Sequence, residues 1–208
     1  MSKQKIIKIN CIDQTIKYPT GCESVSSVML LKHLGIEITV EEFIRDALEC
    51  RSFKEYNIPN KYNIKKQGPN PNEYFVGSPY DHDSFGCYAP VIEKALKRYL
   101  SNDYIVENAT GYPIEELIES INKNIPVIFW ATIDLKEYIG GPCWMLENNT
   151  VFQWRSNEHC MLLVGYDDKN LYFNDPMNSK NSPVLYNRDL ALKRHKEQYE
   201  MAILVKKK

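Results

Sequence analysis

Helical patterns occupy the first part of this chain, and strand patterns occupy the last part. Residues 22–34 are apolar around most of a helix circumference, which is typical of a buried helix. Residues 126–133 form a continuous apolar run typical of a buried strand. Two shorter runs, 160–166 and 171–174, flank a cluster of turn residues and predict a β-hairpin. This order favours an α+β fold, with N-terminal helices packed on an antiparallel sheet, over a parallel α/β fold.

The remaining predicted elements are short. Thr39 and Glu42 have the spacing of a capping box, so a second helix should begin there and extend to about Leu48. Proline suits the first turn of a helix, and two prolines precede residues with helical periodicity. The other predicted elements are strands at 6–11, 151–154 and 201–205 and helices that begin near Pro90, Pro113 and Asp189.

Composition limits the class of protein to which the chain can belong. With 208 residues, a single domain over 1–208 can bury about 70% of its unfolded surface without a disulfide or a metal. The 26 basic and 27 acidic residues nearly cancel, so there is no bulk attraction to nucleic acid or to an anionic membrane. The longest apolar runs, 127–133 and 160–164, are too short to span a bilayer, and we expect no membrane insertion.

Neither the cysteines nor the first residues indicate a cofactor or a leader. The six cysteines form no CxxC pair, and no Cys/His cluster has zinc-finger spacing, so we predict no metal and no cofactor. The basic residues at the start are not followed by an apolar segment, so we predict no signal peptide. We therefore expect a cytoplasmic protein, with an extracellular location as the alternative if the chain has been trimmed.

Residues 51–86 show no sustained helical or strand period, and they contain several prolines, glycines and tyrosines. An irregular stretch of this length inside a compact domain is uncommon, and its aromatic residues argue against disorder. Two interpretations remain open: a functional loop, or a packed surface loop with no role in chemistry.

Cys22 follows Gly21 at the expected start of the buried helix. A thiol attacks only as the thiolate, which a positive local field favours, and a helix N-terminus carries partial positive charge. The glycine leaves space for a substrate carbonyl to approach. Cys22 is therefore a candidate nucleophile, and the alternative is a buried core cysteine, which is common.

A nucleophilic cysteine needs a base, and the chain has four histidines. His33 lies about three turns along the same helix from Cys22 and cannot reach it. His195 lies among basic residues and is predicted to be at the surface, and His82 lies in the irregular stretch. His159 begins the apolar strand of the hairpin and is the candidate base. The alternative is a half-buried histidine bonded to a backbone carbonyl.

Asp175 ends the second strand of the hairpin and is the candidate that orients His159. A turn centred near Asp167 places Asp175 opposite His159, whereas a turn centred one or two residues later slips the pairing. A β-bulge would restore the pairing. Asn174 and Asp167 compete for the same role, and an aspartate before a proline also commonly forms a turn.

A developing oxyanion needs fixed donors, and the backbone N–H of Cys22 can supply one. Gln14 lies eight residues upstream in the preceding loop, and its side-chain amide can supply another. The alternative for a single glutamine in a loop is a solvated side chain.

Several segments follow one another in a recognisable order. They are Gln14, YPTGCES at 18–24, PNPN at 69–72, FVGSP at 75–79, FGCYAPVI at 85–92, PVIFWA at 126–131, EH at 158–159, VGYDD at 164–168 and FNDP at 173–176. Taken together, these segments resemble the C39-like cysteine peptidases, in particular the bacterial peptidase C39-like family 2, over roughly residues 8–178. The resemblance implies a papain-like fold in which Cys22 is the nucleophile, His159 the base, Asp175 the orienting residue and Gln14 the oxyanion donor, and it places the 51–86 loop near the site.

These residues predict a thiol-dependent hydrolase that acts on a peptide or another amide-containing substrate through a thioester. An acyltransferase would use the same residues, with an amine or thiol as acceptor in place of water. A module that binds peptides without turnover is the other alternative. The intact set of Gln14, Cys22, His159 and Asp175 argues against that module.

Other residues offer rival interpretations of the site. Cys87 follows Gly86 before a helix and lies near His82, but it lacks a hairpin His–Asp partner. We interpret Glu23 as structural, with a substrate contact as the alternative. Trp130, Trp144 and Trp154 are candidates for the wall of a substrate cleft, but aromatic residues on strands are usually core, so they are not included in the site. The ligand types of Cys22, Cys87, His159 and Asp175 suit a metal, but their spacing does not support one.

Overall fold

The structure is a computed structural model that describes residues 4–208. The first three residues, which belong to the basic start discussed above, lie outside the described residues. The helices are α1 (Cys22–His33), α2 (Val40–Ala47), α3 (Ala89–Leu96), α4 (Ile114–Asn122) and α5 (Arg188–Glu197), with short 3-10 turns at Ile133–Leu135 and Ser179–Asn181. The strands are β1 (Lys5–Ile6), β2 (Cys50–Arg51), β3 (Lys54–Glu55), β4 (Lys66–Gln67), β5 (Phe75–Val76), β6 (Tyr104–Asn108), β7 (Val127–Thr132), β8 (Ile139–Met145), β9 (Val151–Ser156), β10 (Glu158–Tyr166), β11 (Asn170–Asn174), β12 (Val184–Asn187) and β13 (Ala202–Lys207).

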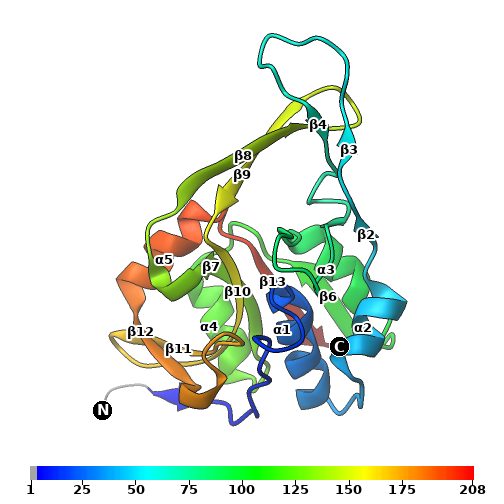
Figure 1. The fold of residues 1–208 in the computed structure, drawn as a ribbon. Coiled ribbons are helices and arrows are strands. Elements are labelled where there is room, and N and C mark those ends of the chain that lie inside the picture. Colours follow the sequence, from blue (N-terminus) through cyan, green and yellow to red (C-terminus); the bar gives the residue numbers. More distant parts are fainter. Residues whose placement is uncertain (1–3) are drawn as a thin grey trace.

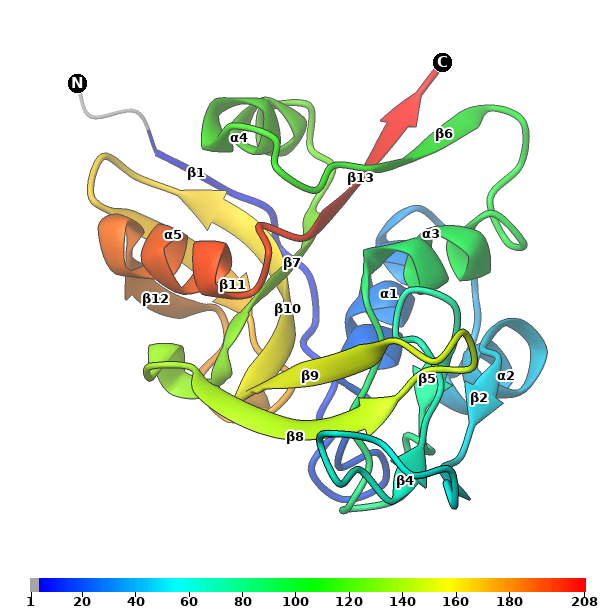
Figure 2. The same cartoon turned by 90° about the horizontal axis from the view of Figure 1, so that it is seen from above.

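The central sheet is antiparallel throughout and carries the strand order β12-β11-β10-β7-β13-β6, with β1 also paired to β10. Figure 2 shows α1 and α5 on opposite sides of β7 and β10. Because both faces of the two central strands are covered, every residue of β7 and β10 is buried. This arrangement confirms the predicted α+β fold, with helices packed on an antiparallel sheet.

Helix α1 is the element that brings the N-terminal part of the chain against the sheet. Its first ten residues are all buried, as the apolar pattern predicted. Small side chains permit a close approach to β10, and the Ser26 hydroxyl donates a hydrogen bond to the Cys160 carbonyl at 3.3 Å. The start of α1 is therefore held beside the start of β10, where His159 lies.

The helix predicted from Thr39 is α2. The Thr39 hydroxyl accepts a hydrogen bond from the Glu42 N–H at 3.1 Å, and the Glu42 carboxylate accepts from the Thr39 N–H at 2.8 Å. These two bonds satisfy donors that a helix end leaves without partners, which confirms the capping box.

The irregular 51–86 stretch joins a second, smaller sheet. Strands β3, β4, β8 and β9 pair in that order, and Figure 1 shows them rising away from the body of the molecule. Strand β8 was not predicted, because its Gly-Gly-Pro sequence is typical of a loop. Aromatic packing holds the base of this sheet to the body, with Phe85 in contact with Phe53, Trp144 and Trp154.

His195 is buried, so the prediction of a surface histidine was wrong. Its ring stacks on Phe129 with centroids 3.9 Å apart, and Nδ1 donates to the Trp130 carbonyl at 2.7 Å. The basic neighbours suggested solvent, but α5 packs its His195 face onto β7. Burial lowers the pKa of His195 to about 4, so the ring is neutral at physiological pH.

A β-bulge in the β10–β11 hairpin decides which face Asp175 occupies. Gly165 pairs with Tyr172, but beyond the bulge Leu163 pairs with Phe173 and Leu162 with Asn174. The register after the bulge places Asp175 opposite Met161, on the same face of β10 as His159. Without the bulge, Asp175 would lie opposite Leu162 and project from the other face.

No helix in residues 4–208 is both long enough and apolar enough to cross a membrane.

Candidate active site

Three of the four predicted site residues line one cavity of about 250 Å³. Gln14 enters it from the loop before α1, Cys22 from the first position of α1, and His159 from the start of β10. Phe85 and Trp154 form part of its apolar wall. The 51–86 stretch therefore contributes to the cavity at its end, through Ser84 and Phe85.

His159 and Asp175 contact each other directly. The ring Nε2 lies 2.7 Å from Asp175 Oδ1, and both side chains are 2% exposed. A carboxylate can only accept, so Nε2 carries the hydrogen and Nδ1 is the nitrogen left to take up a proton. This pairing holds the imidazole in one tautomer and one orientation.

Of the three acidic or amide residues considered for this role, Asp175 is the one beside the ring. Asn174 instead donates to the Ile9 carbonyl at 2.9 Å, and Asp167 accepts from the Lys169 N–H in the turn. Burial opposes ionisation of Asp175, but the hydrogen bond from His159 and the N–H of Met177 outweigh it. Together they hold the pKa of this carboxyl below its ordinary value of 3.8.

Changing Asp175 to asparagine keeps a hydrogen-bond acceptor but removes the charge. We expect a loss of about 1–2 kcal/mol in the free energy of unfolding at pH 7, since hydrogen bonds to charged groups exceed neutral ones by about this amount. A carboxyl with a lowered pKa stabilises the fold above its unfolded pKa, and that contribution is lost as pH falls through the folded pKa. Urea unfolding at pH 7 and at pH 3 should therefore show the gap between variant and wild type closing on acidification. A gap that widens would contradict this account.

Cys22 is 5% exposed at the start of α1, but its surroundings are not the positive field that the sequence suggested. Its thiol donates to Glu23 Oε2 at 3.3 Å, and among the described residues it forms no side-chain hydrogen bond to His159. Burial raises the pKa of the Cys22 thiol well above its ordinary value, and the carboxyls of Glu23 and Glu158 raise it further. The sulfur is therefore protonated in this arrangement.

Close packing also explains the glycine at position 21, in addition to the space that it leaves for a substrate. A Cβ at this position would lie 2.9 Å from Tyr18 Cβ and 3.2 Å from Pro79 Cβ. Glycine therefore lets the 51–86 stretch approach the start of α1. The backbone N–H of Cys22 lies in the first turn, where helices leave their N–H groups without intrahelical partners.

Gln14 is 2% exposed, so it is not a solvated loop residue. Its backbone N–H donates to the Pro176 carbonyl at 3.0 Å, and its side-chain Nε2 donates to the Pro19 carbonyl at 3.1 Å. These bonds fix the amide beside Cys22. The second hydrogen on Nε2 is available to a group in the cavity.

The sequence did not predict two carboxyls beside the sulfur. Donor atoms of Cys22, Glu23 and Glu158 lie within 4.8 Å of one another, and all three residues are buried. This is not the Cys22, Cys87, His159 and Asp175 set considered for a metal. The Glu23 oxygens are already engaged by the Cys22 thiol and by the Cys87 N–H, at 3.3 and 2.6 Å. Because hydrogen-bond donors already engage both Glu23 oxygens, we assign no metal to the group.

Cys87, the rival nucleophile, is fully buried before α3 and does not line the cavity. Burial raises the pKa of its thiol well above the ordinary value, and the Glu23 and Glu158 carboxyls add to this. His82 is exposed and lines no part of the cavity.

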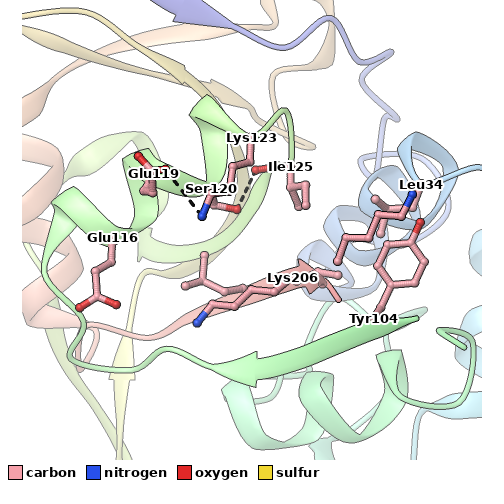
Figure 3. Close-up of a pocket in the computed structure, with 11 residues that line it drawn as sticks. Leu34, Tyr104, Glu116, Glu119, Ser120, Lys123, Ile125 and Lys206 are labelled. Atoms are coloured by element: carbon pink, nitrogen blue, oxygen red, sulfur yellow. Dashed lines mark hydrogen bonds and ion pairs between the residues drawn. The ribbon is translucent and has the colours of Figure 1, made fainter. Parts of the chain in front are cut away.

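A larger cavity of about 500 Å³ lies elsewhere, between α4, β6 and β13 (Figure 3). Neither cysteine nor histidine lines it. Its Ser120 hydroxyl donates to the Ile125 carbonyl at 3.0 Å, and Lys123 pairs with Glu119 at 3.6 Å. This cavity therefore lacks the thiol and the imidazole that the sequence predicts for acyl transfer.

Comparisons with known proteins agree with this architecture. The sequence model of the Peptidase_C39 like family matches residues 6–203. An uncharacterized Bacillus subtilis (strain 168) protein, YvpB, is 27% identical over 202 residues, which cover 97% of this chain and 75% of that protein. A crystal structure described as a C39-like peptidase from Bacillus anthracis superposes with a TM-score of 0.81 at 25% identity, covering 99% of this chain and 98% of that one. The structural likeness is consistent with the papain-like fold that the sequence motifs implied, and the chain belongs to the Peptidase_C39 like family.

Proposed function

We propose that this protein is a thiol-dependent hydrolase of amide or peptide bonds, in which Cys22 is the nucleophile and His159 the base. The observation that carries the proposal is the buried His159–Asp175 pair, 2.7 Å apart, at a cavity that Cys22 and Gln14 also line. A nucleophile, a base and a residue that orients the base are the parts that acyl transfer through a covalent intermediate requires.

The proposed reaction begins when the Cys22 proton passes to His159 Nδ1. The sulfur must first give up its hydrogen bond to Glu23, so the resting thiol and the reactive thiolate are two states of the site. The thiolate attacks the carbonyl carbon, and the new oxyanion accepts hydrogen bonds from the Cys22 N–H and from Gln14 Nε2.

The carbon–nitrogen bond then breaks as the His159 imidazolium gives its proton to the leaving amine, and a thioester remains on Cys22. His159 next removes a proton from water, whose oxygen attacks the thioester and releases a carboxylic acid and the thiol. Asp175 stabilises the imidazolium in both halves of the cycle. An amine in place of water would give a transferase with the same first half. Phe85 and Trp154 provide an apolar wall suited to an apolar part of the substrate.

A covalent intermediate on Cys22 is the direct test. Wild-type protein is mixed with a peptide and cell-wall-fragment library, quenched in acid and digested. We expect the peptide that contains Cys22 to gain the mass of an acyl group, and to lose it on treatment with hydroxylamine, because a thioester is labile to amines. Asp175→Asn should lower the amount that accumulates.

The matched control is Cys143→Ala, which removes an exposed cysteine away from the cavity. It should leave the acylation of Cys22 unchanged. Added amine acceptors separate the two enzyme classes, since a transferase yields the amide of the acceptor. Peptide that binds tightly and leaves every cysteine unmodified would instead identify a binding module and refute the hydrolase.

A further inference from the structure

Two buried carboxyl groups lie beside the proposed nucleophile, and neither exchanges a proton in the reaction described above. Glu23 is 0% exposed and Glu158 is 8% exposed, and one oxygen of each lies within 4.8 Å of the other and of the Cys22 sulfur. Glu23 accepts from the Cys22 thiol and the Cys87 N–H. Glu158 Oε1 is buried and has no hydrogen-bond partner among the described residues.

In the part of the chain that the structure describes, no ion pair offsets the charge that two ionised carboxylates would place here. Within residues 4–208, the ion pairs of lysine, arginine and histidine all involve other acidic residues. An unpaired charge in a buried site is costly, and two like charges at this separation add to the cost, so such groups keep protons instead.

Among the titratable groups around Glu23 and Glu158, the His159 imidazole is the one that can carry positive charge, because the others are thiols and a phenol. The His159 imidazole favours the ionised form of Glu23. Burial raises the pKa of Glu23 to about 7, against the opposing effect of the Cys87 N–H and the Cys22 thiol, and it raises the pKa of Glu158 well above its ordinary value. The titratable groups that face the pair are His159, the thiols of Cys22, Cys50, Cys87 and Cys160, and the Tyr88 phenol.

The backbone is also shaped to hold the two carboxyls together. Gly86 has φ of +126°, and a Cβ there would collide with Glu23 Oε1 and lie 3.2 Å from Glu158 Oε2. The glycine therefore lets the segment before α3 close over both carboxyls and deliver the Cys87 N–H to Glu23.

We propose that Glu158 keeps its proton at neutral pH while Glu23 gains and loses one, and that Glu23 thereby sets the negative charge against which the Cys22 thiol must ionise. Glu23 is a positioning residue, because it acts on the reaction through the sulfur, and Glu158 is its neutral neighbour. The inference rests on the proposed function in naming Cys22 as the reactive thiol, but its test needs no substrate.

As a consequence, the reactivity of the Cys22 thiol depends on pH through the ionisation of Glu23 as well as through its own ionisation. Below the pKa of Glu23 the pair is neutral, so the sulfur ionises against burial alone. Above that pKa a carboxylate lies beside the sulfur and opposes the thiolate. Reactivity should therefore rise less steeply above neutrality than it would for an isolated thiol.

The test measures the rate at which iodoacetamide alkylates Cys22 between pH 5 and pH 9, by peptide mass mapping in the presence of EDTA. In Glu23→Gln we expect a rate near that of wild type at pH 6 and about tenfold faster at pH 8, since one pKa unit of a thiol corresponds to about a tenfold change in thiolate. Glu158→Gln mimics the protonated residue and should keep the wild-type profile. The exposed Glu55→Gln is the matched control and should also keep it.

Infrared spectroscopy gives a second measurement, which does not depend on the alkylation of Cys22. At pH 8 exposed carboxyls are ionised, so wild-type protein should retain the carbonyl band of a buried protonated carboxylic acid, and Glu158→Gln should lack that band. The absence of the band in wild type would overturn the proposal, as would a pH profile that Glu23→Gln leaves unchanged or that Glu158→Gln shifts equally. If these results hold but no acylation of Cys22 is found, the proposed function alone has failed.

Discussion

Replacing Cys22 by alanine is expected to abolish amide hydrolysis, with a fall in kcat/KM by a factor of ~10⁴ or more. The size of the effect follows from the role proposed for the sulfur, which forms the bond that divides the reaction into two steps. The measurement is the rate of product release, on any substrate that the library screen identifies, compared between wild type and variant. Cys143→Ala should retain wild-type turnover, because its side chain is exposed and lies outside the cavity.

The combination of Cys22→Ala with His159→Ala makes this test sharper. Residues that act as one unit give strongly non-additive losses, so the double variant should be about as slow as either single one. Losses that multiply would show that the two side chains act independently. A Cys22→Ala variant that retains turnover would remove the sulfur from the reaction altogether.

The largest expected effect on stability is that of Phe129→Ala in β7. Phe129 is fully buried, stacks on His195 at 3.9 Å and packs on Phe173 at 5.2 Å. Truncation of a buried phenylalanine leaves a cavity and costs about 3–5 kcal/mol. For a chain of this length each kcal/mol lowers Tm by about 2–4 °C. Urea and thermal unfolding measure both quantities.

Ile139→Ala is the control for this change, because the Ile139 side chain is 61% exposed on β8. It should alter the free energy of unfolding by less than about 0.5 kcal/mol, as surface substitutions usually do. Phe129 also pairs with Met161 across the sheet, two residues from His159. A Phe129→Ala variant within about 1 kcal/mol of wild type would mean that the sheet beneath His159 repacks far more easily than its complete burial indicates.

Much of the fold followed from local patterns. The apolar residues of α1, the Thr39 capping box and the buried runs of β7 and β10 were all predicted, because each pattern arises within a few residues of the chain. Strand β8 was not, because its pairing with β9 comes from tertiary contacts that outweigh its glycine and proline content. The predicted strand at 6–11 is ordered as a strand only over Lys5–Ile6.

The sequence indicated which candidate residues lie close together, but it did not indicate the charged groups around them. The motifs indicated Gln14, Cys22, His159 and Asp175, and the structure gathers the first three at one cavity with Asp175 against the His159 ring. The second carboxyl beside the sulfur belongs to Glu158, which only the folding of β10 against α1 brings near Cys22. The one signal available was that a glutamate is adjacent to each of two candidate residues, since Glu23 follows Cys22 and Glu158 precedes His159.

The bulge near Val164 has a consequence for how this hairpin tolerates changes in length. Extra residues in the turn at 167–170 would leave the pairing of Leu162 with Asn174 and of Leu163 with Phe173 intact. The turn can therefore vary in length. One residue added between His159 and Leu163 would rotate the imidazole to the opposite side of the sheet, away from its carboxylate, while two would restore the side but displace the ring by about 7 Å along the strand. Natural variants of this hairpin should therefore differ at its tip and stay constant in length below the bulge.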